Sequence, residues 1–127
     1  FIGKANGVIV DVPCSGLGIV GSKPDIKLNL KPGDVPKILR LQRQILDNAA
    51  DYTADGGVLL YSTCTLNKAE NEDNVRDFLK THPGFELIPI PWLDEPRDYL
   101  IRIEDQTVTI LPGNGYDGFF MALLHKK

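Results

Sequence analysis

The sequence has no long hydrophobic run, and none of its apolar segments approaches the roughly 20 residues that a membrane-spanning helix requires. Its first residues also lack the basic stretch and apolar core of a secretion signal. These absences favour a cytoplasmic protein without a membrane partner. What is present is ordinary globular composition, because 43% of the 127 residues are hydrophobic and 24% are charged, which suits one domain with one core.

Cysteine and histidine are scarce as well. The two cysteines, Cys14 and Cys64, stand far apart, and without a secretion signal we expect both to be reduced thiols. Neither belongs to a CxxC pair, and His82 and His125 are isolated, so the ligand spacing of a zinc site is missing. We therefore expect no bound metal.

An excess of basic residues is also missing. The formal net charge is −3, whereas a stand-alone nucleic-acid-binding domain usually carries a basic surface. The chain begins at Phe1, its one methionine is Met121, and the first apolar segment starts almost at once at Val8. We therefore expect residues 1–127 to be part of a longer protein, whose other parts would supply any affinity for a polyanion.

Apolar runs and the residues that flank them predict alternating strands and helices. Short runs rich in β-branched residues predict strands at residues 7–12, 57–62, 85–90, 99–103, 107–111 and 119–124. Helical spacing predicts a helix over 35–51, stopped by Gly56 and Gly57, and a second helix that starts near Lys68 with Asn67 as its N-cap. This order predicts an α/β fold with a mostly parallel sheet, whose ligands bind beyond the carboxyl ends of the strands.

Two of these strands are followed by a cysteine at matching positions. Cys14 follows the first strand, after Asp11 and Pro13, and Cys64 follows the strand at 57–62. Neighbouring strands lie about 4.8 Å apart, so both thiols can reach one small planar substrate beside Asp11. Two thiols and a carboxylate suit nucleophilic catalysis with proton transfer. A single cysteine in such a place is usually a small buried hydrophobe, but two at matching positions weaken that interpretation.

The residues around both cysteines resemble the motifs of one enzyme family. The segment DVPCSGLG at residues 11–18 resembles motif IV of RNA 5-methylcytosine methyltransferases. The segment YSTCTL at residues 61–66, followed by Asn71 and Glu72, resembles motif VI. The end of the chain, at residues 110–120, is similar too, so the resemblance covers nearly the whole sequence. It is strongest to the bacterial Sun/RsmB group, which acts on small-subunit ribosomal RNA.

This resemblance implies a fold, a cofactor and residue roles. The chain would form the C-terminal half of a Rossmann-like sheet with an antiparallel last strand, in an enzyme that uses S-adenosyl-L-methionine and binds ribosomal RNA. Cys64 would attack C6 of cytosine, Cys14 would assist release of the product, and Asp11 would hydrogen-bond the base. The glycine-rich cofactor motif is expected upstream of Phe1, which leaves Asp11 and Pro13 as candidate cofactor contacts.

The same resemblance implies weaker candidates for contact with the substrate, namely Pro13, Ser15, Gly16 and Lys23. Gly16 equally suits a tight turn, and Lys23 equally suits a solvated loop. The nucleophile has to become a thiolate, and the start of the helix near Lys68 would favour the Cys64 anion.

Two other interpretations stay open. The chain can be a non-catalytic interaction module derived from a methyltransferase half-domain, which its acidic charge favours. It can instead be a thiol enzyme without a nucleic-acid substrate, such as a hydrolase. That enzyme would need a histidine paired with the cysteine, and neither His82 nor His125 is predicted at a strand tip.

Overall fold

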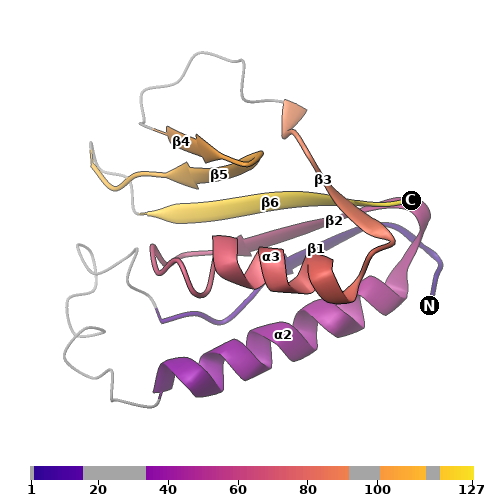
Figure 1. Ribbon diagram of the computed structural model, residues 1–127, viewed down its shortest axis with the longest axis horizontal. Helices are drawn as coiled ribbons and strands as arrows, with labels where there is room; N and C mark the ends of the chain where they lie inside the picture. The colour runs from indigo at the N-terminus through magenta and orange to yellow at the C-terminus, as the bar shows by residue number, and fades with distance from the viewer. Residues whose placement is uncertain (1, 16–33, 92–100, 114–117) are drawn as a thin grey trace.

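A computed structural model describes residues 2–15, 34–91, 101–113 and 118–127. Two helices and six strands make up this part of the chain (Figure 1). In chain order they are β1 (Ala5–Asp11), α2 (Asp34–Tyr52), β2 (Thr53–Thr63), α3 (Glu72–Thr81), β3 (Phe85–Ile88), β4 (Ile101–Glu104), β5 (Thr107–Ile110) and β6 (Phe119–Lys126).

The strands form one six-stranded sheet in the order β1-β2-β6-β5-β4. The remaining strand, β3, also pairs with β6, against residues 123–126, while β5 pairs with residues 119–121 of the same strand. The long strand β6 therefore joins the helix-connected half of the sheet, β1 and β2, to the shorter strands β3, β4 and β5.

The α/β class and the antiparallel last strand are both confirmed, because β6 runs antiparallel to β2. Parallel pairing is confined to β1 and β2 among the described strands, which corrects the expected predominance of parallel strands. A parallel pair needs a long crossover such as α2, whereas β4 and β5 are joined by a tight turn. That turn has positive φ at Asp105 (49°) and Gln106 (71°), as a two-residue hairpin turn requires.

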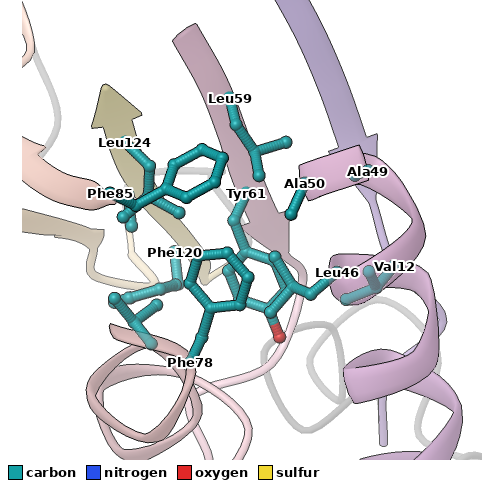
Figure 2. Packing of buried hydrophobic residues seen from close by; sticks show 12 residues of the cluster. Val12, Leu46, Ala49, Ala50, Leu59, Tyr61, Phe78, Phe85, Phe120 and Leu124 are labelled. Carbon is teal, nitrogen blue, oxygen red and sulfur yellow. The ribbon is translucent and has the colours of Figure 1, made fainter. Parts of the chain in front are cut away.

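Both helices pack on the same face of the sheet, α2 under β1 and β2 and α3 beside it (Figure 1). The main core lies between these layers and is built from side chains of both helices and three strands. Phe78 of α3 and Tyr61 of β2 are fully buried there, and Figure 2 shows them beside Leu46 of α2 and Phe120 of β6. Phe78 also contacts Phe85 edge-on, with 5.3 Å between ring centroids. This core fixes the two helices against the strands that carry the cysteines.

Element boundaries follow the sequence prediction closely at α2 and less closely elsewhere. The helix predicted over 35–51 is confirmed by α2, Asp34–Tyr52. The next strand begins directly at Thr53, so Gly56 and Gly57 do not stop the helix but lie inside β2. There the register shifts, since Ala5 pairs with Thr53 while Gly7 pairs with Val58. The extra residues form a bulge, which Gly56 permits with φ of 81°.

Candidate active site

Cys14 and Cys64 lie side by side at the carboxyl ends of two neighbouring strands. β1 and β2 are parallel and in register to their last pair, Asp11 with Ser62, so both chains leave the sheet at the same level. The Sγ atoms of the two cysteines are 2.7 Å apart, and both are free, partly buried thiols. The structure thus brings the two predicted residues together, while their division of roles stays a prediction.

Asp11 ends β1 at the same edge of the sheet. Its side chain is exposed, and Ser62 of the neighbouring strand donates a hydrogen bond to its Oδ1 at 3.1 Å. The amide of Val12 donates to the carbonyl of Ser62, which continues the strand pairing one residue past the end of β1. Asp11 is therefore held in orientation by β2, and its carboxylate remains open to solvent.

The other predicted contact residues divide into three groups. Pro13 is exposed, and its carbonyl accepts a hydrogen bond from Gln42 Nε2 at 2.8 Å. Ser15 is 2% exposed, and its hydroxyl contacts that of Thr65 at 2.8 Å. Its hydroxyl thus has a partner within the protein, and a contact of Ser15 with the substrate stays a prediction. Gly16 and Lys23 lie outside the described residues.

The thiol of Cys64 is held in its neutral form. Burial raises its pKa to about 12, and the hydrogen bond and proximity of Cys14, together with the Asp11 carboxylate, act in the same direction. The expectation that a helix start near Lys68 stabilises the thiolate is wrong, because α3 begins only at Glu72. The residues from Asn67 to Asn71 form turns instead, and the cap residue Asn71 makes no side-chain capping bond.

Glu70 was not among the predicted site residues, and its side chain is fully buried. Its Oε1 accepts hydrogen bonds from the amide of Ser15 at 2.8 Å and from Gln42 Nε2 at 3.1 Å. Its Oε2 accepts from Asn67 Nδ2 at 2.8 Å and from Thr65 Oγ1 at 3.4 Å. One carboxylate therefore joins the segments that follow both cysteines.

A second layer of polar side chains supports this carboxylate. Tyr61 donates to the carbonyl of Glu70 at 2.7 Å, and Asn74 Nδ2 donates to the Tyr61 oxygen at 3.1 Å and to Gln42 Oε1 at 3.2 Å. Burial raises the pKa of Tyr61, so it stays a neutral donor. The sequence did carry a signal for this network, since Gln42 falls on the buried stripe of α2 together with Ile38, Leu46 and Ala49.

The two described histidines do not complete a thiol site of the hydrolase type. His125 pairs with Val58, at the opposite end of the β2–β6 ladder from Thr63, and His82 stacks on Phe78 at the C-terminal end of α3. The arrangement thus offers two thiols and a carboxylate without a paired imidazole among the described residues, which does not support the hydrolase interpretation.

The described residues contain no helix that is both long and apolar enough to cross a membrane. Within the same part of the chain, no three side chains of His, Cys, Asp or Glu come close enough to form a metal site.

An α/β sheet with two thiols and a carboxylate at the carboxyl ends of its parallel strands defines a Rossmann-like domain with a two-cysteine site. The chain belongs to the family described as 16S rRNA methyltransferase RsmB/F, whose profile matches residues 2–125.

Curated relatives and solved structures agree with this assignment. Over 123 residues the chain is 38% identical to the probable ribosomal RNA small subunit methyltransferase B of Bacillus subtilis, with 94% of this chain and 27% of that protein covered. It is 39% identical to ribosomal RNA small subunit methyltransferase B of Thermus thermophilus, with 97% and 30% covered. The chain therefore spans less than a third of the length of these relatives.

Among solved structures, the crystal structure of PH0851 superposes with a TM-score of 0.86 at 36% identity, covering 98% of this chain and 27% of that one. NSun6 from Pyrococcus horikoshii, solved with SFG, superposes with a TM-score of 0.74 at 28% identity, covering 93% and 29%. Both matches confirm the Rossmann-like methyltransferase fold.

Proposed function

We propose that the protein to which this chain belongs transfers a methyl group from S-adenosyl-L-methionine to C5 of a cytosine in small-subunit ribosomal RNA. The observation that carries the proposal is the contact between Cys14 and Cys64, 2.7 Å apart beside the exposed Asp11. The names of the relatives support ribosomal RNA as the substrate.

The chemistry of cytosine explains why two thiols would be needed. C5 is a poor nucleophile until a thiolate adds to C6, because that addition moves the electrons of the C5–C6 double bond toward C5. In the proposal Cys64 forms this bond to C6, and C5 then takes the methyl group. Loss of the C5 proton to Cys14 restores the double bond and expels Cys64, so each thiol serves one half of the reaction.

Proton transfer from Cys64 has to accompany attack. With its pKa raised to about 12, Cys64 rests as a neutral thiol at physiological pH. In the proposal this proton leaves to solvent as the base enters. Cys14, whose Sγ lies 2.7 Å away, also has to lose its proton to solvent before its thiolate can take the C5 proton. A neutral resting thiol also limits side reactions of the nucleophile before the substrate arrives, since the thiolate is the reactive form.

Asp11 is the proposed contact to the edge of the base. Its carboxylate, oriented by Ser62, is exposed at the end of β1 and can accept a hydrogen bond from the exocyclic amino group of cytosine. Uracil has a carbonyl at that position, which would face the carboxylate oxygen with another acceptor. Asp11 would therefore select cytosine, after the base has left its stack to reach the thiols.

The cofactor would approach from the same edge. S-adenosyl-L-methionine supplies an electrophilic methyl group bound to a sulfonium. Asp11 and Pro13 are exposed at the carboxyl end of β1, where open α/β sheets bind their ligands, so both are free to contact it. Support comes from the structural neighbour solved with SFG, an analogue of this cofactor.

The modified nucleoside tests this proposal directly. The full-length protein, incubated with S-adenosyl-L-methionine and unmodified small-subunit ribosomal RNA, is expected to form 5-methylcytosine, detected by mass spectrometry of the digested RNA. Cys64→Ala should form none, because no C6 adduct can be made. A different methylated nucleoside, or full activity in Cys64→Ala, would refute the proposal. Binding of the RNA without any methyl transfer would favour the interaction-module interpretation.

A further inference from the structure

We propose that Glu70 is a positioning residue whose buried carboxylate sets the contact between the two cysteines. Its catalytic consequence rests on the function proposed above, whereas its effect on the thiols does not. Neither cysteine touches Glu70 through a hydrogen bond in the described structure. The residue would act instead through the backbone segments that carry the two sulfurs.

Three of the four hydrogen bonds to the Glu70 carboxylate come from the segments that follow the two cysteines. Ser15, whose amide donates to Oε1 at 2.8 Å, directly follows Cys14. Thr65, whose hydroxyl lies 3.4 Å from Oε2, directly follows Cys64. Fifty residues of chain separate the two cysteines, so without a common partner their segments would be held only by the end of the β1–β2 ladder.

A direct bond between the same two segments completes the clamp. Ser15 Oγ and Thr65 Oγ1 are 2.8 Å apart, and Thr65 Oγ1 also accepts from the amide of Asn67 at 3.1 Å. Gln42 of α2 adds a third element, because its Nε2 donates to Glu70 and to the carbonyl of Pro13. The positions of the residues on either side of Cys14 are thereby fixed.

The hydrogen-bond partners of Glu70 indicate that its carboxyl group holds the two cysteine segments in position. No Lys, Arg or His in the described part of the chain forms an ion pair with it, and all four donors are neutral. A buried carboxylate with only neutral donors is a costly way to fill a core. A carboxyl group, however, carries two acceptor oxygens, so it can bind donors from two segments at once.

Glu70→Gln separates this role from simple filling of space, because the amide has the same shape but only one oxygen. Whichever way it is turned, its NH2 group faces at least one donor of the clamp. The matched control is Glu72→Gln, on the neighbouring helix α3. Glu72 is also buried, at 6% exposure, but its side chain contacts Arg102 at 3.4 Å and no cysteine segment.

The first readout needs neither RNA nor cofactor. Phenylarsine oxide binds two thiols together only when both sulfurs can reach one arsenic atom, and the chelate resists displacement by a monothiol. The full-length wild-type protein and Glu72→Gln should retain the arsenical against 2-mercaptoethanol. Glu70→Gln should lose it at a concentration of monothiol at least about tenfold lower. Unchanged retention in folded Glu70→Gln would overturn the proposal.

A second pair of variants covers the case in which Glu70→Gln does not fold. Thr65→Val removes the hydroxyl that bridges Ser15 and Glu70, whereas Thr65→Ser keeps it. Loss of arsenical retention in Thr65→Val, with recovery in Thr65→Ser, supports the clamp. Equal retention in both contradicts it.

The second readout links the clamp to methyl transfer. Misplacing a reacting group by about 1 Å costs about 100-fold in rate, so kcat of Glu70→Gln should fall by about that factor. The KM values for RNA and cofactor should stay within about twofold of wild type, since Glu70 is buried. If the thiol geometry depends on Glu70 but the wild-type protein methylates no RNA, the positioning role stands and the proposed function fails.

Discussion

Cys64 shows how strongly its surroundings set the chemistry of a single side chain. Two partly buried sulfurs in contact, with a carboxylate close by, favour the protonated thiol, so the pKa of Cys64 rises to about 12. A free cysteine titrates near 8.5, so the surroundings disfavour the resting thiolate by about three orders of magnitude. In the proposed reaction, Cys64 would therefore become a nucleophile only when the base has entered the site and the thiol has lost its proton.

This shift predicts the pH dependence of alkylation. In the full-length wild-type protein, the rate at which iodoacetamide modifies Cys64 should keep rising about tenfold per pH unit beyond pH 9, because only the thiolate reacts. Cys14→Ala removes two of the causes of the raised pKa, so modification at pH 8 should become at least about tenfold faster. Peptide mass spectrometry gives both rates, and a wild-type plateau near pH 8.5 would contradict the raised pKa.

The same shift has a consequence for stability. The folded state holds the Cys64 proton more tightly than the unfolded state does. Its contribution to the free energy of unfolding is therefore complete below the unfolded-state pKa, near 8.5, and is lost as the pH rises toward 12.

Single residues also mark the limit of what the sequence predicts. Cys14, Cys64 and Asp11 could be singled out because each follows or ends an apolar strand that is legible along the chain. Glu70 could not, since its burial depends on Ser15 and Gln42 arriving from distant segments. Its neighbourhood in the sequence, rich in acidic and amide residues, is typical of an exposed helix start, and only the tertiary structure encloses it.

At the scale of elements, the bulge in β2 adjusts the strand to the helix that precedes it. α2 ends at Tyr52 and β2 begins at Thr53, so the chain reverses without a separate loop. The extra residues of β2 between the pairs Ala5–Thr53 and Gly7–Val58 form the bulge, so β2 can begin directly after the helix and still pair with β1. From that point the ladder runs in regular register to Asp11 and Ser62, and this register sets the level at which both cysteine segments leave the sheet.

Two glycines at this bulge give a matched test. A Cβ on Gly57 would lie 2.9 Å from the carbonyl oxygen of Ala54 and 3.0 Å from that of Asn6, whereas a Cβ on Gly7 would meet nothing within 4 Å. Because backbone must shift, Gly57→Ala should lower the free energy of unfolding by about 1–3 kcal/mol. Gly7→Ala should change it by less than about 0.5 kcal/mol.

Denaturant unfolding of the full-length variants measures both effects. Equal stability of the two alanine variants would show that the backbone around Gly57 has room for a Cβ atom, which would contradict the prediction.

Elements were predicted best where one signal dominates. The amphipathic stripe of α2 and the β4–β5 hairpin were both located within a few residues, because helical periodicity and a short polar turn are local patterns. The start of α3 was placed about four residues too early. The turns from Asn67 to Asn71 are held in place by the buried carboxylate of Glu70, to which Asn67 donates a hydrogen bond. This is a long-range constraint, and no local sequence pattern predicts it.

At the scale of the whole molecule, the site exists only because the sheet is assembled. The thiols lie 50 residues apart in the chain and meet through one parallel strand pair, which α2 connects and β6 flanks. Membership of the RsmB/F family and a net charge of −3 fit together if other parts of the protein hold the RNA. The contribution of these residues would then be chemical, through two sulfurs and a carboxylate.

The division of labour between the two sulfurs is the central claim, and trapping of the reaction tests it most directly. Wild-type, Cys14→Ala and Cys64→Ala forms of the full-length protein would be incubated with cofactor and unmodified small-subunit ribosomal RNA, then separated on a denaturing gel. Cys14→Ala is expected to accumulate a covalent protein–RNA adduct, because Cys64 can attack but cannot be released. Cys64→Ala should form none. An adduct that persists in Cys64→Ala, or its absence from Cys14→Ala while that variant still methylates RNA, would contradict the assignment.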